Sequence, residues 1–347
     1  MTTALAVTGA VVAVTGTAVA EPGAVRAEAE LDTVAEVGLD AVTTAAAPEF
    51  RYQVTRNATY QDVPGSTITF TATSAGDQSY LWTRNLSTGN VTSLGSGDNI
   101  GNTFAIRCRD AAGVALPGES GAYWATNLVP PGETSVTPTL RWLFVAPSAG
   151  TYTCRISISS YSTIIVNGRS VTMRIPAGAE LARAVYPKSG RWTLQSADLA
   201  LVGRGNTLTT LGANFAPNVA GADRIAITQD AAVTTCKQGS TITGCSGGSS
   251  GYSGSTVTTW IEAQPQTSTG AACGTVQRSS AVTRGISTAK HHLSVTNTLY
   301  LTESQLGGCA KVRVSLKLRN DAGNPVVVHA GTVGGMAATH GVAFEYV

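Results

Sequence analysis

Residues 311–319 read Lys-Val-Arg-Val-Ser-Leu-Lys-Leu-Arg, so that polar and apolar side chains alternate without a break. Successive side chains of a β-strand point to opposite faces, and this pattern predicts a strand with one face in a core and the other in water. The same alternation recurs around Phe70, Trp142, Ile156 and Met173. Segments rich in Gly, Pro, Asn and Asp lie between these runs and are typical of turns.

The composition agrees with an all-β protein. The chain has 347 residues, of which 13% are charged and 6% aromatic, with 38 Gly. Soluble domains usually carry about 25% charged residues, so coiled coils and highly charged disordered chains are excluded. Only Glu180–Tyr186 is consistent with a short helix beyond residue 48. Many short strands without βαβ alternation predict two antiparallel β-sandwiches of the immunoglobulin-like or jelly-roll-like type.

The chain divides into four parts by composition. We expect a signal peptide at 1–20, an acidic pro-segment or linker at 21–48, a first sandwich at 49–222 and a second at 223–347. The segment 176–222 contains strand-like pieces that either complete the first sandwich or bridge the two. No internal sequence repeat is visible.

The first 20 residues are expected to direct secretion. Residues 4–19 are apolar or small, too few to span a bilayer comfortably, and are followed by the small-x-small pattern Ala18-Val19-Ala20. No Lys or Arg precedes the run, so we expect either that translation starts further upstream or that the signal is atypical. A buried N-terminal strand is the alternative interpretation. Few Lys beside many Arg, Ala and Val are typical of a bacterial genome rich in G and C. The expected location is extracellular, without a membrane span.

Residues 49–347 keep 22 of the 23 basic residues and 15 of the 21 acidic ones, a net charge of +7. This mild positive charge is compatible with anionic surfaces but is far from that of a nucleic-acid-binding protein. No nucleic-acid partner is therefore expected.

Part of the first sandwich resembles the immunoglobulin-like family. Ala149-Gly150-Thr151-Tyr152-Thr153-Cys154 is similar to the F strand of that family, where a Tyr two residues before a Cys forms the tyrosine corner. Trp82 lies where the family's C-strand Trp would lie. The strand around Phe70 has no Cys, so the family's usual disulfide is absent. The resemblance covers residues 60–160 and implies a sandwich rather than a particular function.

Six cysteines in an exported chain predict disulfide bridges and no metal site. If each sandwich pairs its own cysteines, Cys108 joins Cys154, and three pairings remain for Cys236, Cys245, Cys273 and Cys309. Cys236–Cys245 and Cys273–Cys309 are favoured, because the first closes a short Gly/Ser loop and the second ties a loop to the strand 311–319. The absence of any C-x2-C pair argues against zinc.

No catalytic residue or cofactor is predicted. Gly247–Gly251 matches G-x-S-x-G, but Ser249 lies in a Gly/Ser-rich run without the strand and helix that the motif needs. His291 and His292 are adjacent on a predicted strand, so their side chains should diverge, and the histidines are expected at the surface or rim. The scattered carboxylates form no recognisable pair.

Two features are candidate ligand-binding sites. Tyr123 and Trp124 form an aromatic pair in a segment bounded by Pro and Gly, suited to stacking on a sugar or anchoring a protein partner, or else to plugging one end of the sandwich. Lys311, Arg313, Lys317 and Arg319 form a basic stripe on one strand face, suited to an anionic cell-wall polymer or else only solvated.

These observations favour a secreted, non-catalytic binding or adhesion protein of the extracellular space or cell surface. The candidate partners are a carbohydrate, an anionic cell-wall polymer or another protein. Two alternatives stay open. One is a structural subunit of a surface layer or filament, with self-association through strand edges. The other is a secreted hydrolase with an acid pair that no motif announces.

Overall fold

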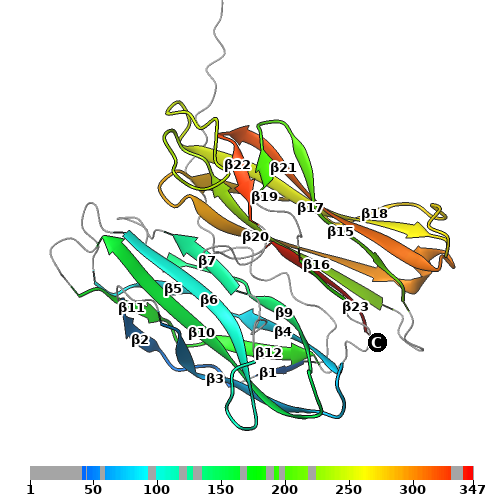
Figure 1. Ribbon diagram of the computed structural model, residues 1–347, viewed down its shortest axis with the longest axis horizontal. Helices are drawn as coiled ribbons and strands as arrows, with labels where there is room; N and C mark the ends of the chain where they lie inside the picture. Colours follow the sequence, from blue (N-terminus) through cyan, green and yellow to red (C-terminus); the bar gives the residue numbers. More distant parts are fainter. Residues whose placement is uncertain are drawn as a thin grey trace, which may run out of the picture.

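The computed structural model describes residues 41–43, 45–54, 59–92, 99–116, 123–127, 135–164, 170–184, 191–194, 200–217, 224–329 and 339–346. The residues in these ranges form antiparallel β-strands and one short 3-10 helix, Glu303–Leu306. No helix in these ranges is long and apolar enough to cross a membrane. The strands form two bodies that lie side by side (Figure 1).

The N-terminal sandwich has one continuous four-stranded layer. Its strands follow the order β3-β10-β6-β7. Their bounds are β3 Gln61–Ala72, β10 Gly150–Ile164, β6 Asn99–Asp110 and β7 Tyr123–Asn127.

The opposite layer consists of two short sheets with matching orders, β1-β12-β4-β9 and β2-β11-β5-β8. Four stretches of the chain each contribute one strand to the first sheet and one strand to the second. The two short sheets therefore continue each other and together make one bent four-stranded layer. The bounds are β1 Ala41–Thr43, β2 Phe50–Gln53, β12 Glu180–Ala184, β11 Thr172–Ile175, β4 Gln78–Arg84, β5 Thr88–Asn90, β9 Arg141–Val145 and β8 Ser135–Val136.

The C-terminal sandwich repeats this arrangement. In one layer β16 pairs with β20 on one side and with β23 and β22 on the other, and these pair in turn with β13 and β14. In the second layer β15 pairs with β21, β21 with β17, and β17 with β18 and β19. The bounds are β13 Arg191–Leu194, β14 Ala200–Val202, β15 Thr207–Phe215, β16 Arg224–Thr235, β17 Gly254–Gln266, β18 Gln277–Arg278, β19 Val282–Ser287, β20 His292–Thr302, β21 Lys311–Gly323, β22 Val326–Val328 and β23 His340–Tyr346.

Both sandwiches have the strand order of a jelly roll. When the eight stretches of each sandwich are numbered along the chain, the two layers follow the orders 1-8-3-6 and 2-7-4-5 in both. This arrangement is a double sheet that contains two Greek keys. The duplication of topology has no counterpart in the amino-acid sequence.

The alternation predicted from sequence is present in the cores. On β3 the side chains of Ile68, Phe70 and Ala72 are buried between the layers, while the threonines between them face solvent. On β21, Val312 and Leu318 are fully buried, and Lys311 and Arg313 lie on the outer face. Burial of one face of each strand is the main stabilising contribution of such layers.

The motif that resembles the immunoglobulin-like F strand forms the hydrogen bond of a tyrosine corner. Tyr152 Oη donates to the carbonyl oxygen of Ser148 at 2.8 Å. The neighbouring cysteine behaves differently from that family, because Cys154 is bonded to Cys108 on the adjacent strand of the same layer. Cys236–Cys245 and Cys273–Cys309 are the other bridges, so all six cysteines are paired as the sequence favoured.

Two local expectations differ from the structure. Residues 180–184 form strand β12 rather than a helix, because Leu181, Ala182 and Ala184 are all buried against neighbouring strands. The expected linker 21–48 ends inside the sheets: Ala41–Thr43 is a strand, and the amide of Ala47 donates to the carbonyl of Ala179. Within 176–222, β12 belongs to the N-terminal sandwich, and β13, β14 and β15 belong to the C-terminal one.

The two sandwiches pack through their 1-8-3-6 layers. Tyr80 and Trp82 on β4 form one apolar cluster with Phe344 on β23, and all three side chains are buried. The rings of Tyr80 and Phe344 lie 4.7 Å apart between centroids. Strand β7, at the edge of the N-terminal 2-7-4-5 layer, also contacts β20 of the C-terminal sandwich. The 2-7-4-5 layer of the C-terminal sandwich lies on the far side of its own core and faces away from the junction.

Candidate functional site

The outer face of the layer β15-β21-β17-β18 carries the basic stripe found in the sequence. Arg313 and Arg319 are exposed on this face, and Lys311 and Lys317 are half-buried. The alternation of β21 places all four on one side of the sheet, because the residues between them fill the core.

A tryptophan that was not among the predicted site residues also lies on this face. Trp260 on β17 is half-buried and pairs directly with Lys317 on β21. Side chains directly opposite on antiparallel strands share one face at a separation of about 4.5–5.5 Å between Cβ atoms. The sequence contains a signal for Trp260, because it shares one face of its strand with the polar residues Thr258 and Glu262.

One carboxylate organises the surroundings of the tryptophan. Glu262 accepts a hydrogen bond from the indole Nε1 of Trp260 at 3.0 Å. The same carboxylate forms ion pairs with Arg278 at 2.9 Å and with Lys317 at 3.7 Å. Lys317 also donates to the hydroxyl of Thr209 at 2.8 Å. These contacts fix the orientation of the indole and leave its ring bordered by charged groups.

The opposite side of the indole has a second charged pair. The guanidinium carbon of Arg319 lies 6.0 Å from the centre of the Trp260 ring. Arg319 donates to Asp321 at 2.5 Å, and Asp321 also accepts from the hydroxyl of Thr258. We call Trp260, Glu262, Arg278, Lys317 and Arg319 the Trp260 platform. An aromatic ring held by planar, hydrogen-bonding side chains on a sheet face is suited to stacking on a flat ligand that bears hydroxyl groups.

The stripe continues beyond the platform. Arg313 pairs in register with Gln264 on β17 and with Asn214 on β15. Lys311, at the end of the strand, donates to the carbonyl of Ser268 at 3.0 Å. All four residues of the predicted stripe therefore share one sheet face with the Trp260 platform.

The other predicted ligand-binding residues lie in the N-terminal sandwich. Tyr123 and Trp124 belong to strand β7, where their backbones pair with Ala105 and Phe104 on β6. Their side chains lie outside the described part of the structure. The aromatic pair and the basic stripe therefore belong to different sandwiches.

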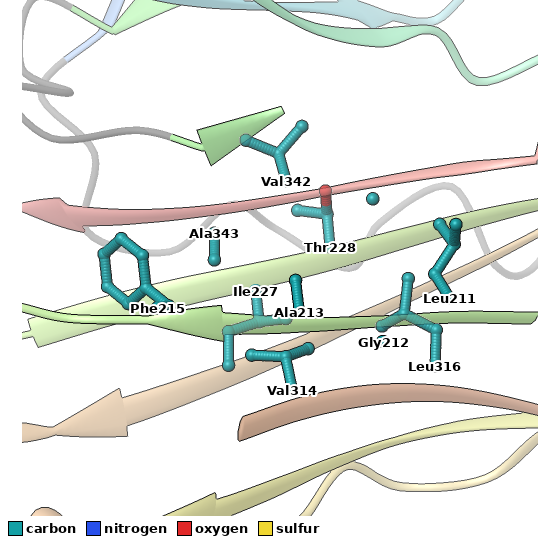
Figure 2. Close-up of a pocket in the computed structure, with 11 residues that line it drawn as sticks. Leu211, Gly212, Ala213, Phe215, Ile227, Thr228, Val314, Leu316, Val342 and Ala343 are labelled. Carbon is teal, nitrogen blue, oxygen red and sulfur yellow. The ribbon is translucent and has the colours of Figure 1, made fainter. Parts of the chain in front are cut away.

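The C-terminal sandwich has an apolar pocket between its layers. Its empty space is about 330 Å³, part of which is open to solvent. Figure 2 shows side chains from β15, β16, β21 and β23 around it, among them Leu211, Phe215, Ile227 and Val314. No carboxylate, imidazole or thiol belongs to this lining. Acid–base chemistry therefore has no group to act through in this pocket.

Three histidines gather at one end of the C-terminal sandwich, contrary to the expectation that they lie at the surface or rim. The hydroxyl of Thr234 contacts both His292 Nδ1 and His329 Nε2, and the rings of His291 and His292 lie 4.2 Å apart. Burial, with a contribution from Lys237, lowers the pKa of His291 to about 4. Burial, with a contribution from His291, lowers the pKa of His329 to about 4. Burial also holds the pKa of His292 well below its usual value.

A charged network lies between the two sandwiches. Arg141 on β9 forms an ion pair of 2.8 Å with Asp230 on β16, and both side chains are almost wholly inaccessible to solvent. His340 Nε2 lies 3.0 Å from the other oxygen of Asp230. Burial opposes ionisation of Asp230, but Arg141 and His340 outweigh it and hold its pKa below the usual value. Within the described ranges, no three His, Cys, Asp or Glu side chains are arranged to hold a metal ion.

Comparisons with known proteins identify no family. No protein-family model and no curated protein sequence matches this chain. Among solved structures, a chain from the structure of infectious bursal disease virus Gt strain is 11% identical to this chain in sequence. The TM-score of the match is 0.26, and it covers 88% of this chain and 80% of that chain. The CBM22-1-CBM22-2 tandem domain of Paenibacillus barcinonensis Xyn10C has 9% identity and a TM-score of 0.21, with 88% and 99% covered. A putative secreted protein from Parabacteroides distasonis has 7% identity and a TM-score of 0.17, with 86% and 89% covered. At such scores no ligand or activity is transferred to this chain.

Proposed function

We propose that this chain is a secreted, non-catalytic binding protein that holds carbohydrate on the outer face of its C-terminal sandwich. The observation that carries the proposal is the Trp260 platform. An indole fixed by Glu262 offers a ring for stacking, and Arg278 and Lys317 offer donors for hydroxyl groups around it.

Three further observations support this function. The outer face lies away from the junction between the sandwiches, which is made by Tyr80, Trp82 and Phe344. Two side chains of the platform are exposed to solvent, with exposed fractions of 66% for Arg278 and 49% for Arg319. All six cysteines are bridged, as expected for an oxidising extracellular compartment.

We further propose a division into two domains that accords with the sheets. The first would comprise residues 41–184 and the second residues 191–346, preceded by the signal peptide 1–20 and an acidic segment that ends near residue 40. This division assigns the binding platform to the second domain alone.

The proposal is tested with Trp260→Ala in the full chain. Loss of the stacking ring should weaken binding to an oligosaccharide about tenfold, which corresponds to about 1.4 kcal/mol. This lies within the range of about 0.5–1.5 kcal/mol that aromatic contacts contribute beyond their buried area. Glycan-array screening of the wild type followed by isothermal titration with the best oligosaccharide measures the effect.

Tyr252→Ala is the matched control, since Tyr252 is an exposed aromatic residue in a loop and pairs with Arg204 rather than with the platform. Its binding should equal that of the wild type. The circular dichroism spectra and melting temperatures of both variants should stay close to wild type. Full binding by a folded Trp260→Ala variant, or no binding of any glycan by the wild type, would remove the proposal.

A further inference from the structure

Arg313 differs from the other exposed cations of this face. Arg278, Lys317 and Arg319 each form an ion pair with Glu262 or Asp321. The side chain of Arg313 is exposed and forms no hydrogen bond or ion pair within the described part of the chain. Its guanidinium is therefore available to a ligand without first breaking an internal contact.

The surroundings of Arg313 favour a planar acidic group. Its neighbours across the strands are the amide residues Gln264 and Asn214 rather than carboxylates. Gly212 on β15 lies beside it, and a Cβ built on that glycine would lie 3.9 Å from Arg313 Nη2. The absence of a side chain at Gly212 leaves the guanidinium uncovered on this side. A guanidinium presents parallel N–H donors that match a carboxylate in a bidentate manner.

The net charge of the whole face also favours an acidic ligand. Five cations (Arg278, Lys311, Arg313, Lys317 and Arg319) share it with two carboxylates, Glu262 and Asp321. Both carboxylates lie at the Trp260 end, so the uncompensated positive charge lies at the end formed by Lys311 and Arg313. A ligand that extends in this direction meets a positive field with no internal counter-charge.

The distance between Trp260 and Arg313 suits an oligosaccharide of several sugars rather than a single sugar. Gln264, which pairs with Arg313, is four residues from Trp260 along β17, and at about 3.3 Å per residue this corresponds to roughly 13 Å. A ligand that touches both positions must therefore extend along the strands.

We propose that the ligand is a polysaccharide with carboxylate groups, which stacks one sugar ring on Trp260 and places a uronate carboxylate on Arg313. This inference rests on the proposed carbohydrate-binding function and specifies its ligand class. Lys311 adds to the field at the same end. Because the guanidinium is solvent-exposed, screening by salt should weaken this contact, whereas stacking on Trp260 should persist.

The experiment compares an oligogalacturonate with its carboxyl-reduced, neutral counterpart of equal length, by isothermal titration at 20 and 300 mM salt. The wild type should bind the acidic oligomer about tenfold more tightly at low salt, and the preference should shrink at high salt. Arg313→Gln should abolish the preference while the neutral oligomer binds as before. Trp260→Ala should weaken binding of both oligomers.

Arg204→Gln is the matched control, because it removes the same charge from a residue that contacts Tyr252 outside the face. It should keep the full preference. The inference would be overturned if Arg204→Gln lost the preference for the acidic oligomer or if Arg313→Gln kept it. Tighter binding of a sulfated oligosaccharide than of the oligogalacturonate would also overturn it. If the wild type binds only neutral oligosaccharides in a Trp260-dependent way, the proposed function holds and the acidic ligand is excluded. If no oligosaccharide binds, both fall.

Discussion

Asp230 carries its charge in a region between the sandwiches from which solvent is excluded. Two nitrogen atoms of Arg141 donate to it, one of them to both carboxylate oxygens, and His340 approaches it from β23. Arg141 also donates to the carbonyl oxygens of Gln229 and Asn297. A buried ion pair adds little net stability compared with apolar residues, but removal of one partner leaves the other charge uncompensated.

Asp230→Asn should therefore destabilise the protein by about 3–5 kcal/mol. Urea unfolding followed by tryptophan fluorescence measures the change. Glu49→Gln, which removes an exposed carboxylate paired with Arg51, should leave the midpoint unchanged. Unchanged stability of Asp230→Asn would show that Arg141 finds other compensation. Combined replacement of Arg141 and Asp230 by Met and Leu should recover much of the loss, because no orphaned charge then remains.

The roles of Arg141 and Trp260 could not be predicted from the sequence, and the reason is physical. Alternation assigns a residue to one face of a strand, but it does not reveal what covers that face. Arg141 alternates with Leu140 and Trp142 as an outward-facing residue should, yet its outward face is covered by the second sandwich. The basic stripe could be predicted, because its outer face stays in water.

The ends of β16, β20 and β22 bring His329 close to the adjacent residues His291 and His292, although it is distant from them in sequence. Neighbouring side chains on an extended strand diverge, which is why the sequence predicted separate histidines. His291 escapes that rule, since its φ of 38° lies in the left-handed region and it precedes the strand. Its ring can therefore lie beside that of His292.

This cluster predicts a loss of stability in mild acid. The pKa values of His291 and His329 are about 4 in the folded chain, whereas an unfolded histidine titrates near 6.5. Between these values the unfolded chain binds more protons, so stability must fall as the pH decreases from about 6.5 to 4. Thermal melts across this range should show a falling midpoint, and His329→Gln should show a shallower fall. Ring resonances of His291 or His329 that titrate near pH 6.5 in NMR spectra would contradict the explanation.

The number of buried faces on a strand also explains which strands could be predicted from the sequence. Strands with one wet face, such as β3 and β21, alternate clearly. Almost every residue of β16 is buried, because this strand lies between its own core and the N-terminal sandwich. Its sequence consequently shows no alternation, as is usual for strands covered on both faces. The same double burial turns Glu180–Ala184 into a strand despite its helical spacing.

At the scale of the molecule, local patterns were sufficient for the all-β sandwich class. They were insufficient for the duplicated jelly-roll order, since pairing of the first stretch with the last depends on contacts between residues more than 100 positions apart, such as Val42 with Arg183. The two sandwiches share topology, although no internal repeat is visible in the sequence. Different apolar side chains fill equivalent layers equally well, so a common fold leaves no necessary repeat in the sequence.

The junction between the sandwiches should make them unfold together. Phe344 is fully buried among Tyr80, Trp82 and Leu143, and its replacement by Ala should cost about 3–5 kcal/mol, mostly from the junction. The wild type should melt in one calorimetric transition, whereas Phe344→Ala should melt in two, because each sandwich then keeps its own core but loses the coupling. Ile156→Ala is the control: it removes a fully buried side chain from the core of the N-terminal sandwich and should lower the midpoint without separating the transitions. Two transitions already in the wild type would show that the sandwiches are uncoupled, and a single transition in Phe344→Ala would assign the coupling to the Arg141–Asp230 network instead.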